Sequence, residues 1–228
     1  MWISFIHFRF FGKGPIVRSR GLSLTKGFTL IELLVVLAII TTLSTVFIFQ
    51  QRRFDSSTLL RSLAYSVALS VRQAQTYGTS VRQFGGSAGS FNYSYGVYFG
   101  TGDASHYYLF ADVNGDKQRA NNGSEDVQRF SIGNGYTLVQ FCATPSSGGS
   151  PQCTDSSTSA LTWLVIYFKR PNPEACFATN NDASACSTTS STYKDAYVRI
   201  QGPTKGVTDT RRITITTTGQ ISVGVFGS

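Results

Sequence analysis

The chain has 228 residues, enough for one domain with an appendage, and a formal net charge of +8. Residues 1–27 hold five bases and no acid, so the remainder carries only 15 bases against 12 acids. This small surplus excludes overall basicity as an argument for a nucleic-acid partner. Only 14% of the residues are charged, which is typical of a β-rich secreted domain and untypical of a cytosolic enzyme.

An apolar run extends from Leu30 to Phe49 and contains one charged residue, Glu32. As a helix it measures about 30 Å, the thickness of the hydrocarbon core of a bilayer. The bases before the run outnumber Arg52 and Arg53 after it, so we expect one span with a cytoplasmic N-terminus and a translocated C-terminal part. An ordinary secretory signal peptide is disfavoured, because FIFQQRRFD offers no small-x-small cleavage site after the run.

Glu32 is costly in a membrane, by about 2.5–3.5 kcal/mol on insertion scales, and therefore predicts a cationic partner. A cut just before Phe28 creates a free amine. In a filament, that amine on one subunit can pair with Glu32 of its neighbour. The alternative is a protonated acid or an ion pair without consequence.

The segment from Lys26 to Glu32, KGFTLIE, followed by LLVVLAII, resembles the signature of type IV prepilins and type II secretion pseudopilins. The resemblance implies an inner-membrane precursor that a prepilin peptidase cuts after Gly27 and methylates on Phe28. It also implies that Glu32 serves assembly with other pilins or pseudopilins. We therefore divide the chain into a leader (1–27), a transmembrane and assembly helix (28–51) and a periplasmic or extracellular pilin-like domain (52–228).

The helix is predicted to continue beyond the apolar run to about Tyr77, with Gly78 as its C-terminal stop. Apolar residues at offsets of three, four and seven then form one face that can pack on a globular domain. These residues are Leu60, Leu63, Ala64, Val67, Val71 and Ala74.

From about Val81 the periodicity changes to two, with glycine and asparagine between the runs, which predicts strands. The last two runs alternate well around Gly219 and predict a hairpin with one apolar face. A helix packed on an antiparallel sheet follows, hence an α+β fold. The predicted strands are Tyr95–Phe99, Tyr107–Ala111, Val127–Ile132, Thr137–Phe141, Leu161–Lys169, Ala196–Gln201, Arg211–Thr217 and Gln220–Phe226.

This second half resembles one branch of the family, the H-type pseudopilins and FimT-like minor pilins. The shared features are Tyr95-Gly96-Val97, the run Leu109–Asp112 that leads into an Asn-Gly-Asp turn, and the closing hairpin with Gly219. The resemblance implies a minor pilin or pseudopilin of the type II secretion system or of a type IV pilus.

Four cysteines, Cys142, Cys153, Cys176 and Cys186, lie in polar loops without zinc-ribbon spacing or a nearby histidine. An even count of this kind predicts two disulfides and an oxidising compartment. Of the three possible pairings we favour Cys142–Cys153 and Cys176–Cys186, because each closes a loop of roughly ten residues. Free thiols in the core are the alternative.

Asp112, Asn114 and Asp116 place oxygen side chains at alternate positions, as at the start of a calcium loop. The position at which an EF-hand has its glutamate is Gly123, although Glu125 lies nearby. We favour an Asx turn without metal, with calcium as the alternative, and we expect no other cofactor.

Residues 85–89 fit a Gly-x-Ser-x-Gly nucleophile pattern around Ser87, with His106 as the candidate base. A strand-like run follows where that motif needs a helix. We therefore expect a flexible loop, a surface position for His106 and no enzymatic activity.

Lys205, Arg211 and Arg212 form a small basic patch in the sequence, with Asp209 among them. Resemblance to FimT-like proteins implies possible phosphate contacts with DNA, and solvated loop charges are the alternative. The leading hypothesis is a structural filament subunit. A DNA-binding minor pilin for natural transformation is the second hypothesis.

Overall fold

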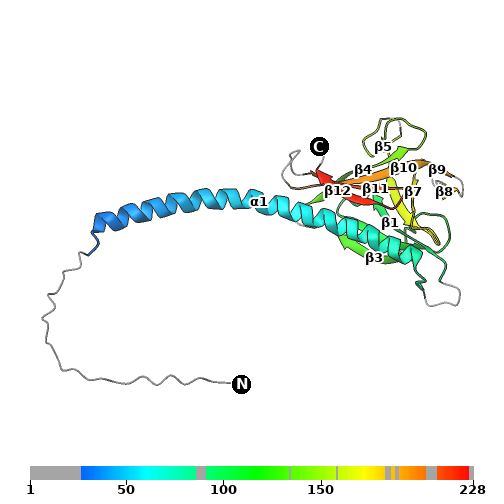
Figure 1. Ribbon diagram of the computed structural model, residues 1–228, viewed down its shortest axis with the longest axis horizontal. Helices are drawn as coiled ribbons and strands as arrows, with labels where there is room; N and C mark the ends of the chain where they lie inside the picture. The colour runs from blue at the N-terminus through cyan, green and yellow to red at the C-terminus, as the bar shows by residue number, and fades with distance from the viewer. Residues whose placement is uncertain are drawn as a thin grey trace, which may run out of the picture. The chain divides into compact units, whose positions relative to one another are not determined.

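The computed structural model describes residues 27–85, 91–133, 135–157, 159–182, 186–187, 190–203 and 210–225. The chain divides into two compact units, Met1–Phe47 and Ile48–Ser228. One long helix, α1 (Leu30–Thr79), contributes residues to both units (Figure 1). An apolar N-terminal helix together with an antiparallel β-domain confirms the predicted α+β fold.

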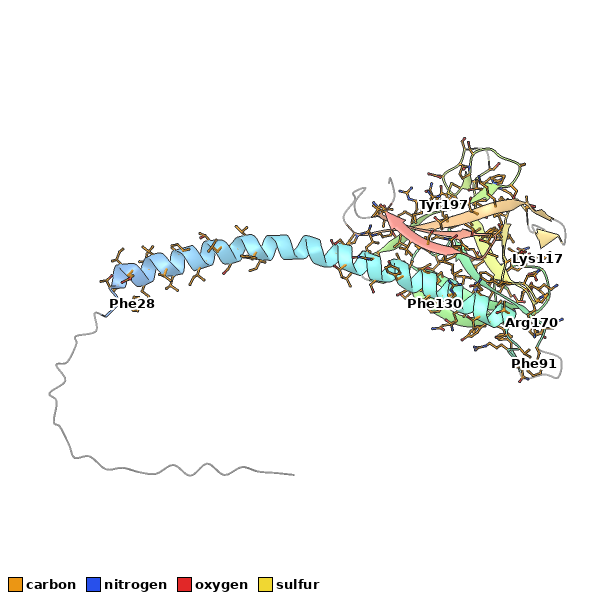
Figure 2. All side chains as sticks on the ribbon, in the orientation of Figure 1. Phe28, Phe91, Lys117, Phe130, Arg170 and Tyr197 are labelled. Atoms are coloured by element: carbon orange, nitrogen blue, oxygen red, sulfur yellow. A yellow bond between two sulfur atoms is a disulfide. The ribbon has the colours of Figure 1, made fainter. Side chains whose placement is uncertain are left out.

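The first part of α1 is apolar on every side. Leu30–Ile48 is long and apolar enough to cross a membrane, by length and composition, and none of it is buried. Its side chains project from the ribbon in all directions, beginning near Phe28 (Figure 2). A helix that is apolar all round must be covered by something other than its own chain.

The second part of α1 packs on the β-domain along the predicted face. Leu60, Ala64, Val67, Val71 and Ala74 are each at most 1% exposed, and Leu63 is partly buried against them. The offsets of three and four residues place these side chains on one stripe of the helix. The amphipathic helix predicted from the sequence is confirmed.

The expected stop at Gly78 is wrong, because α1 continues to Thr79. A Cβ atom at Gly78 would lie 2.5 Å from the carbonyl oxygen of Phe168 and 2.8 Å from its Cβ. Glycine is required here because the last turn of the helix approaches a strand closely.

The β-domain contains two five-stranded antiparallel sheets and one small hairpin among its described residues. The first sheet has the order β3-β2-β1-β6-β7, the second β12-β11-β10-β4-β5, and β8 pairs with β9. The strands are β1 Ser94–Gly100, β2 His106–Asp112, β3 Asp126–Ser131, β4 Thr137–Pro145, β5 Gln152–Cys153, β6 Trp163–Phe168, β7 Ala175–Thr179, β8 Cys186–Ser187, β9 Ser190–Ser191, β10 Tyr193–Gln201, β11 Thr210–Thr216 and β12 Ile221–Val225.

The main core contains the buried stripe of α1 and side chains from both five-stranded sheets. Buried hydrogen bonds tie the helix in place: the hydroxyls of Ser70 and Tyr107 lie 2.9 Å apart, and the Gln75 amide donates to the carbonyl oxygen of Pro173 at 2.8 Å. A second, smaller cluster contains Phe110 and Tyr167. Neighbours in sequence, such as Leu109 and Phe110, belong to different clusters, so the first sheet buries side chains on both of its faces.

All eight predicted strands exist, most with bounds within two residues of those expected. The structure adds β5, β7, β8 and β9, which sequence periodicity did not indicate. Three of these have two residues, too few for any alternation to show, and β7 is defined by its pairing with β6. The single predicted sheet is in fact two, which alternation along each strand cannot reveal.

Candidate functional site

The chain enters α1 through a short exposed segment, Gly27–Thr29. Among the described residues, no atom beyond its chain neighbours lies within 4 Å of the position that a Cβ would take on Gly27. The Phe28 side chain is 83% exposed. The described residues after the predicted cleavage point therefore leave it uncovered.

Thr29 caps the N-terminus of α1. Its Oγ1 accepts a hydrogen bond from the Glu32 backbone N–H at 3.2 Å, and its carbonyl oxygen accepts one from Leu33 at 3.1 Å. The sequence signal is a Thr-x-x-Glu capping box, which the prediction of the helix start did not use. The cap places Glu32 in the first turn, where the positive end of the helix dipole favours a carboxylate.

The Glu32 carboxylate has no hydrogen-bond or ion-pair partner among the described residues. Other polar side chains of the apolar part of α1 are satisfied locally: Thr41, Thr42 and Thr45 donate to carbonyl oxygens one turn earlier, at 2.8–3.0 Å. Glu32 is therefore the one charge in Leu30–Ile48, and its predicted pairing with a cationic group stays a prediction.

The turn after β2 begins at Asp112, the last residue of that strand, and includes Asn114 and Asp116. Side chains of the turn accept hydrogen bonds from its own backbone. The Asp112 carboxylate accepts backbone N–H groups from Gly115 at 2.8 Å and Lys117 at 3.3 Å. Asn114 accepts the N–H of Asp116 at 3.0 Å. These are the Asx-turn bonds that the sequence favoured.

A buried carboxylate, Glu125, completes this loop. It is 3% exposed and accepts backbone N–H groups from Val113 at 3.0 Å and Ala120 at 2.9 Å. Burial raises the pKa of Asp112, and the carboxylates of Asp116 and Glu125 add to the rise against the two backbone bonds. No three His, Cys, Asp or Glu side chains in the described part of the chain are grouped to hold a metal. Calcium binding stays a prediction.

Cys142 and Cys153 form a disulfide, as predicted. Cys176 is also disulfide-bonded. The side chain of Cys186 lies outside the described residues, so its pairing stays a prediction. The bonded pair packs against Tyr197, whose hydroxyl lies 3.5 Å from the Cys153 sulfur.

Of the predicted basic patch, the two described arginines do not share a face of the sheet. Arg211 and Arg212 are consecutive in β11, so their side chains leave opposite faces of the second sheet, and Lys205 lies outside the described residues. Arg212 instead stands directly opposite Arg199 of β10, with its guanidinium carbon 3.8 Å from the centre of the Tyr197 ring. Arg199 was missed because only strand register brings it beside Arg212.

Ser87, the candidate nucleophile, lies outside the described residues. His106 is the first residue of β2 and partly exposed, and its Nδ1 lies 2.9 Å from an Asp103 carboxylate oxygen.

Comparison with known proteins gives one match. Residues 19–48 match the family model for the prokaryotic N-terminal methylation motif. No curated protein and no solved structure matches the chain. The motif lies over Gly27, Phe28 and Glu32 and over the exposed apolar part of α1.

The match supports a type IV pilin-like protein. It marks the chain as a substrate of prepilin peptidase and a structural protein, and it implies assembly with other pilins. An apolar N-terminal helix with this motif is consistent with a membrane-anchored pilin.

Proposed function

We propose that this chain is the precursor of a structural subunit of a type IV pilus or type II secretion filament, cut after Gly27 and methylated on Phe28 by prepilin peptidase. The observation that carries the proposal is the unpartnered Glu32 carboxylate on a helix surface that is otherwise apolar and uncovered. A charge and an apolar surface that have no partner among the described residues are both satisfied in a bundle of like helices.

Before assembly, the apolar part of α1 holds the subunit in the inner membrane. The bases of the leader stay in the cytoplasm and the β-domain lies on the periplasmic side. Each apolar side chain removed from water here gains about 1.5–3 kcal/mol for a full-sized aliphatic group. The membrane therefore holds the unassembled subunit, and no partner protein is needed to cover its apolar helix.

During assembly, the amine exposed at Phe28 binds Glu32 of the neighbouring subunit. Methylation leaves this amine able to carry its positive charge, as methylation does for a lysine. Since Thr29 fixes the helix start, amine and carboxylate are held one turn apart at one end of every subunit. Pairing across subunits sets the axial register of the helices.

Intact-mass analysis of the protein extracted from its native membrane tests the proposal. The expected mass is that of residues 28–228 with one added methyl group and two disulfides. Substitution Gly27→Leu is expected to retain the leader, because the enzyme must accommodate the residue before the cut. Gly224→Leu, at an equally open position of β12, is the control. A native protein that keeps its first 27 residues sinks the proposal.

The minor pilin and H-type pseudopilin branch is the form of subunit that we favour. Its support is the Tyr95-Gly96-Val97 segment in β1 and the closing hairpin, β11 and β12, which turns at Gly219 with φ of 79°. Cross-linking in cells followed by mass spectrometry of the linked subunits distinguishes a pilus from a secretion filament.

A second candidate function, binding of DNA for natural transformation, is favoured by Arg212. Its guanidinium carbon lies 3.8 Å from the centre of the Tyr197 ring, and Arg212 makes no hydrogen bond or ion pair within the described ranges. Arg199 stands directly opposite, and two neighbouring guanidinium groups attract a phosphate.

A mobility-shift titration of the full chain in detergent, at two salt concentrations, tests this candidate. Phosphate contacts predict affinity that falls steeply with salt, and Arg212→Gln is expected to reduce that slope by about one. The control is Arg61→Gln on α1, where another arginine lies over a tyrosine. Absent or salt-independent binding removes this candidate.

A further inference from the structure

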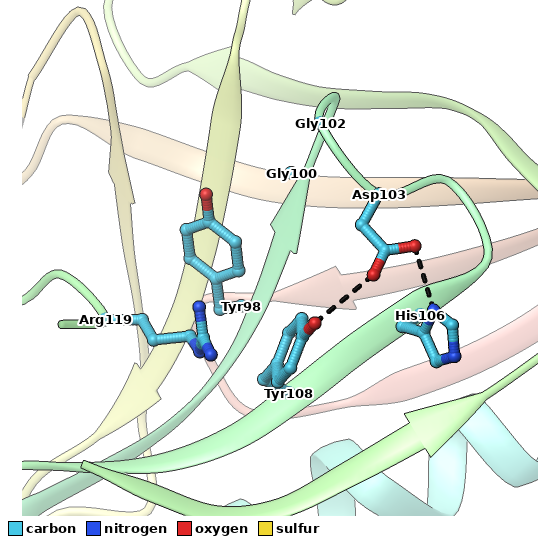
Figure 3. Close-up of a pocket in the computed structure, with 7 residues that line it drawn as sticks. All are labelled: Tyr98, Gly100, Gly102, Asp103, His106, Tyr108 and Arg119. Carbon is cyan, nitrogen blue, oxygen red and sulfur yellow. Dashed lines mark hydrogen bonds and ion pairs between the residues drawn. The ribbon is translucent and has the colours of Figure 1, made fainter. Parts of the chain in front are cut away.

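An open depression with a volume of ≈ 130 Å³ lies on the first sheet, at the turn between β1 and β2 (Figure 3). Its lining comes from three places along the chain: Tyr98 and Gly100 of β1, the turn with β2, and Arg119 from the loop after β2. The filament function uses none of these residues. An enclosed engineered cavity of about 150 Å³ holds one benzene ring, so the slightly smaller but open depression can hold part of one six-membered ring, with the rest in solvent.

The charges in the depression already have partners. Arg119 makes two hydrogen bonds of 2.6 Å to the Asp126 carboxylate. Asp103 lies 2.9 Å from His106 Nδ1 and 3.5 Å from the guanidinium of Arg129. A charged ligand therefore gains little, because each fixed charge is balanced by a neighbour.

What remains unused is neutral hydrogen-bonding capacity. The Tyr98 hydroxyl has no partner in the described part of the chain and can donate or accept. Among the described residues the Nη1 atom of Arg119 makes no hydrogen bond and is a spare donor. A hydroxyl that can donate or accept and a guanidinium donor thus line one ring-sized space.

Aromatic surface lines the same space. The rings of Tyr98 and Tyr108 meet edge to face at 6.4 Å, and Arg119 lies 3.8 Å from the centre of the Tyr108 ring. Tyr98 lies down over Gly100, where a Cβ would come within 2.7 Å of its hydroxyl. Figure 3 shows the Tyr108 hydroxyl directed at Asp103, so that ring is fixed as well.

We propose that this depression binds one neutral sugar ring of a glycan. A pyranose has an apolar face of C–H groups that packs on a tyrosine ring, and hydroxyls that need donors and acceptors together. Balanced charges, a spare hydroxyl, a spare guanidinium N–H and the Tyr98 ring match that chemistry, and Arg119 already covers one face of Tyr108. Arg119 and Tyr108 are positioning residues, since their own contacts hold the walls in place.

Saturation-transfer NMR on the full chain in deuterated detergent tests this, with methyl glycosides of neutral hexoses and N-acetylhexosamines as probes. Transfer to ring protons of at least one glycoside is expected. Gly102→Leu is expected to weaken binding by about tenfold or more, because a side chain there fills the mouth of the depression. No atom lies within 4 Å of a Cβ on Gly102, so the fold tolerates the change. Gly224→Leu, equally open but on the second sheet, is the control.

Tyr98→Phe is the second variant, and it decides the matter if Gly102→Leu fails to fold. It keeps the ring and loses the hydroxyl, so binding is expected to weaken by about two- to tenfold. Absence of transfer to every glycoside overturns the proposal. So does unchanged binding in Tyr98→Phe or in a folded Gly102→Leu protein. Filament assembly does not depend on either result.

Discussion

The two parts of the continuous helix α1 differ in where their apolar side chains lie and in how far these are exposed. In Leu30–Ile48 every side chain is exposed, and apolar residues surround the helix. In the part from Leu60 to Ala74 one stripe of apolar residues is almost wholly buried, whereas Tyr65 and Leu69, off this stripe, are exposed. Under the proposed function, the apolar residues of the first part contact surroundings outside the chain, first lipid and then neighbouring helices. In the second part it forms the chain's own core.

Carboxylates differ between the two regions in the same way. Glu125 and Asp112 in the β-domain accept backbone N–H groups of their own loop. Glu32 accepts nothing within the described residues. Hydrogen bonds within the loop mark the carboxylates that hold the fold, whereas under the proposed function Glu32 pairs with a group that arrives at assembly.

Among the variants that test this contrast, loss of the Glu32 charge is expected to have the largest effect. Glu32→Gln keeps the size of the side chain but removes its attraction for the Phe28 amine of a neighbour. We expect its recovery in sheared filaments to fall by about tenfold or more, equivalent to ~1.4 kcal/mol or above. Glu174→Gln, at an exposed position of the β-domain, is the control. Normal incorporation of Glu32→Gln subunits contradicts the assembly model.

Matched leucine truncations measure the difference between the two parts of α1. Leu60, 1% exposed, lies in the core, so Leu60→Ala is expected to lower the free energy of unfolding of the β-domain by about 2–5 kcal/mol. Leu37, 53% exposed, has no such core, so Leu37→Ala is expected to leave that value unchanged. Chemical denaturation in detergent, followed by the fluorescence of Trp163, gives both numbers. Equal losses contradict the division of the helix into two regions.

The features that were predicted correctly from the sequence are those that periodicity or charge determines. The six apolar positions of α1 occur at helical offsets, and the final hairpin alternates around Gly219, so both were confirmed. The motif around Gly27 and Glu32 was visible for a similar reason, since its residues are contiguous.

Features that depend on the register between paired strands could not be predicted from the sequence. Arg199 lies beside Arg212, and Tyr98 beside Tyr108, only because their strands pair in a particular register. Gly78 was predicted to be a helix stop because the sequence does not show that Phe168, which is far away along the chain, packs against it. The division into two sheets depends on which strands pair, and alternation along a strand carries no information about that.

Close packing of α1 in the β-domain predicts an unusual outcome for a glycine. Gly78→Ala in a helix normally gains up to about 1 kcal/mol. Here the added methyl meets the backbone of Phe168, so we expect a net loss of about 1–3 kcal/mol from overpacking. Gly224→Ala, in open space, is expected to be neutral. Thermal unfolding of the two variants measures the difference, and a Gly78→Ala protein as stable as the wild type shows that the helix end can move away.

The smallest expected effect concerns the internally satisfied acids of the β-domain. Burial raises the pKa of Asp103, but hydrogen bonds from His106, the Ser105 backbone and Tyr108 outweigh it and hold the pKa below its usual value. Stability from Asp103 is therefore complete above the unfolded-state pKa of about 4 and is lost as the pH falls through the lower folded value. Asp112, whose pKa is raised, has the opposite sign: stability increases as the pH falls through its folded pKa.

Melting temperatures between neutral and strongly acidic pH separate these two contributions. Asp103→Asn is expected to flatten the acid-side decline slightly, because its carboxyl is partly exposed and water screens its interactions. Asp112→Asn is expected to make the acid-side decline of the melting temperature steeper, because the substitution removes a carboxyl whose raised pKa opposes that decline. Parallel shifts of the two variants contradict the assignment of opposite signs.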